Sequence, residues 1–183
     1  MGAAFAMTVQ MVASREESKG SEISQDGNHG AIEGPDKRNK KLATKIYVNE
    51  GGELETKTIT MSVNGVDEKI AQAYIESIEK GWSELGVDIE LVDSGGDLML
   101  LPCEPLVCTT TNANGDPLGA ASVGGQKMLY GKGQLETTPA HEFGHILGLQ
   151  HGGRPGGIMT TGYGFQRRVV TSSDLLRVRS LYE

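Results

Sequence analysis

The chain has 183 residues, 37% of them hydrophobic, and a formal net charge of −7. This length is enough for one domain with a real core, and nothing in the charge distribution resembles a nucleic-acid footprint. No apolar run approaches the length of a membrane-spanning helix.

The N-terminal residues 1–43 differ in composition from the remainder, and we place the folded domain at residues 44–183. Residues 1–14 make a poor signal peptide, because no basic residue stands at their start and polar residues interrupt the apolar run. The polar stretch 15–41 is typical of a disordered linker or a short propeptide. Its basic cluster, residues 37–41, is either a processing site or a solvated group of charges.

Short apolar or alternating runs separated by turn residues predict the strands of one mixed sheet. These runs are residues 45–48, 87–92, 97–101, 120–123 and 127–130. A further run, residues 57–62, is either another strand or half of a hairpin with the first.

A long helix packed along one side is predicted at residues 66–85. Its apolar side chains recur at steps of three and four residues, which is the spacing of one helix face. They are Ile70, Ala71, Tyr74, Ile75, Ile78, Trp82 and Leu85. A stripe of this kind indicates packing against a core, so we assign it no chemical role.

The two cysteines of the chain, Cys103 and Cys108, have four residues between them. Zinc ligation would need two more soft ligands nearby. Two uses therefore stay open, a disulfide that closes one small loop or two free thiols. We expect no catalytic role in either case.

Residues 141–151 follow the pattern His-Glu-x-x-His-x-x-Gly-x-x-His, which predicts a zinc site with its own general base. His141 and His145 are four residues apart, so they lie on one helix face and both imidazoles reach one metal ion. Glu142 stands beside the first ligand, where its carboxylate can take a proton from a metal-bound water.

The rest of the pattern brings the chain back to the metal. A regular helix would pass the metal, and Gly148, which tolerates positive φ and is common at helix ends, lets the chain turn. His151 then completes an all-imidazole ligand set and leaves the fourth zinc position open. Thr138 as N-cap and Pro139 as first helical residue predict where this helix begins.

The residues after the third histidine narrow the type of site. Met159 follows His151 by eight residues within Gly-Gly-Ile-Met-Thr, and Tyr163 follows four residues later. This spacing resembles the metzincins, which carry a Met-turn, and among them the matrixins, the matrix metalloproteinase family. The resemblance makes Met159 the Met-turn residue, packed beneath the metal, and Tyr163 a wall of the S1′ pocket.

The resemblance covers about residues 43–183 and implies an α+β fold of the metzincin-like zincin type. This fold has a twisted mixed five-stranded sheet, two long helices (helix A and the zinc helix), and a C-terminal helix after the Met-turn. The last segment, residues 171–183, is similar to that final helix, and a Ser or Thr cap predicts its start before Asp174.

Matrixins bind extended substrate along one sheet edge, which here corresponds to residues 118–123. The expected substrate-binding residues are Gly119, Ala120 and Ala121. An extended peptide would add to this edge through main-chain hydrogen bonds, with alternate side chains in pockets. A plain, weakly packed strand is the other interpretation of these small residues.

The sequence departs from the matrixin pattern in its ion sites and its latency device. Between Cys103 and Lys132, where matrixins generally carry structural zinc and calcium, there is one Asp and no His. We therefore expect no structural zinc, and calcium stays open through Asn112, Asn114, Asp116 and backbone carbonyls. No cysteine stands ahead of the domain to form a matrixin-type cysteine switch.

The predicted function is that of a secreted, monomeric zinc endopeptidase that acts on protein or peptide substrates. One Zn²⁺ on the three histidines polarises the scissile carbonyl, and Glu142 carries the proton from water to the leaving amine. Two alternatives stay open. One is a metal-stabilised, non-catalytic binding or toxin-delivery module, against which the intact Glu142 argues. The other is a minimal bacterial metzincin outside the matrixin group. The domain could equally be released from a larger secreted protein.

Overall fold

The computed structural model describes residues 37–103, 119–121, 124–131, 137–153, 155–160 and 168–183. The helices of this part of the chain are α1 (Glu68–Gly81), α2 (Thr138–Leu147) and α3 (Ser172–Tyr182), with 3-10 turns η1 (Leu42–Thr44) and η2 (Ser83–Leu85). The strands are β1 (Ile46–Val48), β2 (Leu54–Thr56), β3 (Ile59–Val63), β4 (Ile89–Val92), β5 (Leu98–Pro102), β6 (Ala120–Ala121) and β7 (Lys127–Tyr130).

The main sheet has the strand order β4-β3-β5-β7-β6. β3 pairs in parallel with both β4 and β5, and β5 pairs in parallel with β7. β6 runs antiparallel to β7, with Ala121 opposite Met128, and within the described residues it forms one edge of the sheet. This mixed five-stranded sheet with its helices confirms the predicted α+β fold.

The first predicted strand belongs to a different sheet. β1 pairs antiparallel with β2 in a separate two-stranded sheet, with Ile46 opposite Thr56. Residues 49–53 form a turn in which the Asn49 N–H donates to the Glu53 carbonyl over 2.8 Å. This turn reverses the chain, so that β2 lies beside β1. The prediction that residues 45–48 join the main sheet was wrong, and β3 holds a central place there instead.

Helix α1 forms where its apolar stripe was predicted. Asp67 caps the first turn by accepting a hydrogen bond from the Lys69 N–H, and the stripe is buried except for the partly buried Ile70. At the C-terminal end, the Trp82 indole N–H donates to the Ala140 carbonyl over 2.8 Å. A side chain at Gly81 would place its Cβ 2.6 Å from that of Ala140. These contacts hold α1 close to the start of α2.

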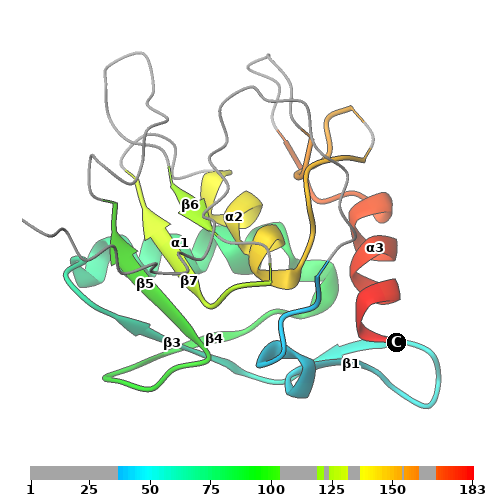
Figure 1. Cartoon of the computed structure of the whole chain (residues 1–183), viewed down its shortest axis with the longest axis horizontal. Helices are drawn as coiled ribbons and strands as arrows, with labels where there is room; N and C mark the ends of the chain where they lie inside the picture. Colours follow the sequence, from blue (N-terminus) through cyan, green and yellow to red (C-terminus); the bar gives the residue numbers. More distant parts are fainter. Residues whose placement is uncertain (1–36, 104–118, 122–123, 132–136, 154, 161–167) are drawn as a thin grey trace, which may run out of the picture.

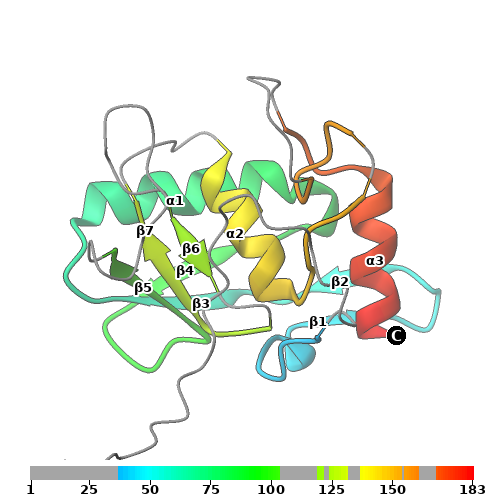
Figure 2. The same ribbon diagram turned by 45° about the horizontal axis from the view of Figure 1, so that its top comes forward.

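The helices lie at different places around the sheet. Figure 1 shows α1 running across the back of the sheet, α2 beside the β6 edge, and α3 on the far side of α2. Figure 2 shows the same order from another direction. α2 contacts α1, β6 and β7, whereas α3 contacts β1. None of the helices in the described ranges is long and apolar enough to span a membrane.

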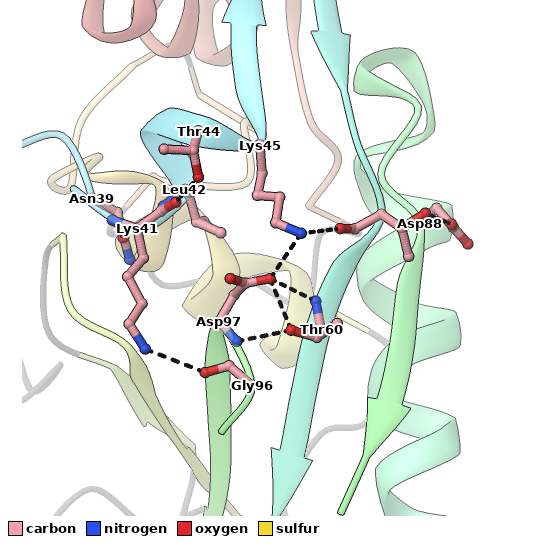
Figure 3. A network of polar contacts seen from close by, with 10 residues as sticks. Asn39, Lys41, Leu42, Thr44, Lys45, Thr60, Asp88, Gly96 and Asp97 are labelled. Carbon is pink, nitrogen blue, oxygen red and sulfur yellow. Dashed lines mark hydrogen bonds and ion pairs between the residues drawn. The ribbon is translucent and has the colours of Figure 1, made fainter. Parts of the chain in front are cut away.

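A polar network joins the starts of β1, β3 and β5 (Figure 3). The Asp97 carboxylate accepts hydrogen bonds from the backbone N–H and the hydroxyl of Thr60, each over 2.9 Å. The Lys45 ammonium lies 3.4 Å from the same carboxylate. Burial raises the pKa of Asp97, but these hydrogen bonds and the Lys45 charge outweigh burial and hold that pKa below its ordinary value.

The segment ahead of the expected domain boundary is packed on the domain. The Lys37 N–H donates to the Gly148 carbonyl over 3.0 Å. Asn39 is fully buried, accepts from the backbone N–H groups of Lys41 and Leu42, and donates to the Gly125 carbonyl. Residues 37–42 thus run beside the C-terminal end of α2.

Helix α3 begins as its sequence predicts. The Thr171 hydroxyl accepts from the Asp174 N–H while the Asp174 carboxylate accepts from the Thr171 N–H, which is a capping box. Val178 and Tyr182 bury one side of the helix, and the Tyr182 hydroxyl donates to the Leu147 carbonyl over 3.1 Å. These contacts fix α3 against the end of α2.

Candidate metal centre

Helix α2 carries the first part of the histidine pattern into the interior. It begins at Thr138, one residue earlier than predicted, and Thr137 precedes it without a side-chain cap bond. Pro139 stands in the first turn, where a missing backbone N–H costs nothing. Every residue from 139 to 147 is buried. The histidines of α2 therefore sit in a largely dry environment, where electrostatic interactions are strong.

The three predicted ligands come together. His141 and His145 project from successive turns of α2 and are 6% and 2% exposed. Gly148 ends the helix in the left-handed region, with φ of 105°, and its N–H donates to the carbonyls of Gly144 and His145. The turn brings His151 back, so that one ring nitrogen from each histidine lies within 4.8 Å of the other two. Sequence spacing predicted this group correctly.

The orientation of the imidazoles fits a metal ion. Nδ1 of His141 lies 2.6 Å from the Ile158 carbonyl oxygen, and Nδ1 of His145 lies 2.8 Å from that of Leu149. Because a carbonyl oxygen only accepts, each Nδ1 carries a proton, and in the neutral ring Nε2 is then the nitrogen that presents a lone pair. The sequence could not predict these two partners, because every residue has a backbone carbonyl.

The spacing of two of the ring nitrogens matches zinc. Nε2 of His141 and Nε2 of His151 are 3.3 Å apart. Two nitrogens on a tetrahedral zinc ion, each at about 2.0–2.1 Å, would be roughly 3.3 Å apart. Three imidazoles at this separation, two of them buried, are a donor set suited to a divalent cation, and His141, His145 and His151 are the residues that could hold it.

Met159 lies against the helix that carries two of the histidines. It is fully buried, and a side chain at Gly144 would place its Cβ 2.2 Å from the Met159 sulfur. The Met159 carbonyl also accepts from the Gly152 N–H over 2.9 Å, next to His151. Glycine at position 144 therefore leaves room for the methionine against α2, and a larger side chain there would force Met159 to move.

Glu142 shares the burial of its neighbours. It is 3% exposed and follows His141 directly on α2. Burial raises the pKa of the Tyr74 hydroxyl, and the negative charge of Glu142 raises it further. The phenol of Tyr74 therefore stays protonated over the whole neutral range, and it accepts a hydrogen bond from the Gly131 N–H over 3.2 Å. The negative charge of Glu142 thus acts on a phenol that does not ionise near neutral pH.

A comparison with models of known protein families identifies the family of this chain. The sequence profile of the family described as Matrixin matches residues 25–183. The chain belongs to the matrixin family. Membership places it in the general class of zinc metallopeptidases, whose substrates are proteins, and the histidine group fits the zinc site of a matrixin.

Comparison with solved structures includes a match to the structure of Myroilysin. The two are 14% identical, with a TM-score of 0.46, over 68% of this matrixin and 79% of the other chain. No curated protein matches in a sequence comparison.

Several predicted residues of this matrixin lie outside the described residues. They are Tyr163, Cys108, Asn112, Asn114 and Asp116. Cys103 follows β5 and takes part in a disulfide. Cys108 is the only other cysteine in the sequence, and its pairing with Cys103 stays a prediction.

The predicted substrate edge of this matrixin lies beside α2. Ala120 and Ala121 form β6, and Gly119 precedes it. A Cβ at Gly119 would lie 3.0 Å from the Leu129 carbonyl oxygen, 3.1 Å from the Tyr74 hydroxyl and 3.2 Å from a Thr138 methyl. Glycine therefore lets the edge strand approach α1 and α2 closely, so the chain here is tightly packed. The role of these residues in substrate binding stays a prediction.

Proposed function

We propose that this matrixin is a zinc-dependent endopeptidase. The observation that carries the proposal is the convergence of three imidazoles around one point, with Nε2 of His141 and His151 3.3 Å apart and a buried carboxylate on the adjoining residue. Zinc, held by His141, His145 and His151, would supply Lewis acidity that polarises the scissile carbonyl and lowers the pKa of a bound water.

Glu142 carries out the proton transfers in this proposal. Its carboxylate takes a proton from the water that attacks the peptide carbonyl, and then delivers that proton to the nitrogen of the leaving amine. Helix α2 holds the carboxylate one residue from His141 and keeps it buried, which favours transfer to the substrate over loss to solvent. The carbonyls of Ile158 and Leu149 orient both α2 imidazoles and select the tautomer whose Nε2 can bind the metal.

The substrate in this proposal lies along β6. An extended peptide would pair with Gly119, Ala120 and Ala121 through main-chain hydrogen bonds. Support comes from the position of β6 at an edge of the described sheet and from its contact with α2. Tyr163 would form the wall of the pocket for the side chain that follows the cleaved bond. These assignments rest on the family resemblance.

Replacing Glu142 with glutamine tests the proposal. We expect the Glu142→Gln variant to bind zinc as the wild type does and to lose about 10²–10⁴-fold in kcat/KM, because the amide cannot accept the proton. The measurement is cleavage of a proteome-derived peptide library, with zinc content determined on the same samples. The matched control is Glu90→Gln, a change at an exposed position of β4, which should leave both values unchanged.

The same experiment separates the alternatives. Wild-type protein that binds zinc and cleaves nothing in the library would contradict the enzyme and favour a metal-stabilised binding module. Protein that binds no zinc would contradict both.

We also propose that the catalytic domain, which we place at residues 44–183, works outside the cell as a monomer with one catalytic zinc ion. The disulfide at Cys103 supports an oxidising environment, and matrixins typically act there. Detection of the protein in culture medium, a single-copy mass in solution, and a Cys103–Cys108 peptide in a non-reducing digest are the expected results.

A further inference from the structure

The three histidines differ in how the fold holds them. His141 and His145 are part of α2, whereas His151 lies between the helix end at Gly148 and two glycines with positive φ, Gly152 and Gly153. Glycine at successive positions lowers the cost of backbone motion. The position of the third imidazole must therefore be set by contacts from outside its own segment.

One such contact comes from α3. The Arg177 guanidinium donates from Nη2 to the Gln150 carbonyl over 2.9 Å, at the residue directly before His151. Its Nη1 lies 4.0 Å from the Cβ position of Gly152, on the other side of His151. The guanidinium therefore reaches both neighbours of the third histidine. In Figures 1 and 2 the segment that follows α2 passes between α2 and α3.

The support for Arg177 is rigid. Its helix starts with the capping box of Thr171 and Asp174, and Val178, the next residue, is fully buried. A hydrogen bond from a charged donor is about twice as strong as a neutral one, and the planar guanidinium is oriented in advance, unlike a lysine ammonium. The hydrogen bond from Arg177 to Gln150 thus links the fixed helix α3 to the flexible segment that carries His151.

We propose that Arg177 is a positioning residue for the third metal ligand, which holds the Gln150 carbonyl so that Nε2 of His151 stays beside Nε2 of His141. The proposal rests on the zinc site proposed above. It adds a residue from outside the histidine pattern to the set that determines metal affinity, in the way that outer partners of ligands commonly do.

The test is metal binding by the full chain carrying Arg177→Gln or Arg177→Lys. We expect the zinc Kd of Arg177→Gln to rise about 10–100-fold, and the visible absorption of bound Co²⁺ to change because one ligand is no longer fixed. Arg177→Lys should recover part of the affinity, since it keeps the charge. The control is Arg179→Gln on the same helix, whose partner is Glu183 at 2.7 Å and whose side chain is 41% exposed; it should match the wild type.

A merely structural role gives a different result. In that case Arg177→Gln lowers the urea stability of the metal-free protein but leaves the zinc Kd and the Co²⁺ spectrum unchanged, and this outcome overturns the proposal. If Arg177→Gln does not fold, a wild-type spectrum and Kd for Arg177→Lys overturn it equally. Wild-type protein that binds neither metal refutes the zinc site itself, whereas normal wild-type binding with normal variants refutes Arg177 alone.

Discussion

The histidine cluster has a helix half, His141 and His145, and a loop half, His151, and different contacts hold the two halves in place. His141 and His145 are buried on α2, and hydrogen bonds of the helix itself fix their spacing. His151 is only partly buried, and contacts with residues distant in sequence set its place. Hydrogen bonds between neighbouring residues fix the positions of side chains on a helix, so a change elsewhere in the molecule disturbs them little. A side chain that is held by several distant contacts moves when any one of these contacts is lost. We therefore expect the site to fail first on the loop side.

Removing the metal should show this difference most clearly. Zinc that binds only the folded state stabilises it by about 4 kcal/mol at a free concentration 1,000 times Kd, and a chelator should remove that amount in urea unfolding. Hydrogen exchange should then accelerate more at the Gly152 N–H, which donates to Met159, than at the amides of α2. Equal acceleration in both places would contradict the comparison, and zinc returned in excess should reverse both effects.

The turn between the two halves offers a second test. Gly148 has φ of 105°, and a Cβ there would lie 2.0 Å from the Lys37 carbonyl oxygen. Gly148→Ala should therefore cost the left-handed strain of about 1–2 kcal/mol and a further 1–3 kcal/mol or so from the collision, and it should weaken zinc binding by moving His151. Urea unfolding of the metal-free protein and zinc titration are the measurements.

Gly86 supplies the matched control for that change. It has φ of 62° and nothing within 4 Å of its Cβ position, so Gly86→Ala carries the strain without the collision. We expect it to lower stability by about 1–2 kcal/mol and to leave the zinc Kd unchanged. If Gly148→Ala lowers stability and zinc affinity no more than Gly86→Ala does, then residues 37–42 do not pack closely against the turn at Gly148.

The same division explains which parts of the molecule could be predicted from sequence. Helical periodicity locates the buried side of α1, and the spacing of the histidine pattern predicts the ligand group, because both depend on the local geometry of a helix. The parallel neighbours of β3 and the departure of β1 from the main sheet could not be predicted, since strand pairing is decided by long-range contacts. Periodicity alone allowed residues 57–62 to be either hairpin or sheet.

The groups that hold the histidines in place could not be predicted from the sequence either. The carbonyls of Ile158 and Leu149 exist in any chain, and Arg177 carries no mark that separates it from Arg179 two residues later. The packing of residues 37–42 was missed for a related reason. Their composition is polar, and only the tertiary structure shows that Asn39 is fully buried among backbone partners.

A change far from both halves should affect stability but not metal binding. The pKa of Asp97 is held low by Thr60 and Lys45 against the effect of burial, so its stabilising effect is present above the unfolded pKa, near 3.9. That effect is lost as the pH falls through the lower pKa of the folded state. Asp97→Asn should therefore destabilise the metal-free protein near neutral pH, and the difference from wild type should shrink as the solution is acidified below about pH 4.

The expected size of this last effect is small, because the partners are partly exposed. We expect less than about 1 kcal/mol from the ion pair with Lys45, with the hydrogen bonds from Thr60 partly kept by the asparagine oxygen. Urea unfolding at several pH values measures it, with Asp93→Asn at an exposed position as the control. The zinc Kd of Asp97→Asn at neutral pH should equal that of the wild type. A shift in that Kd would mean that the sheet transmits strain to α2, and the two halves of the cluster would then not be the only determinants of metal affinity.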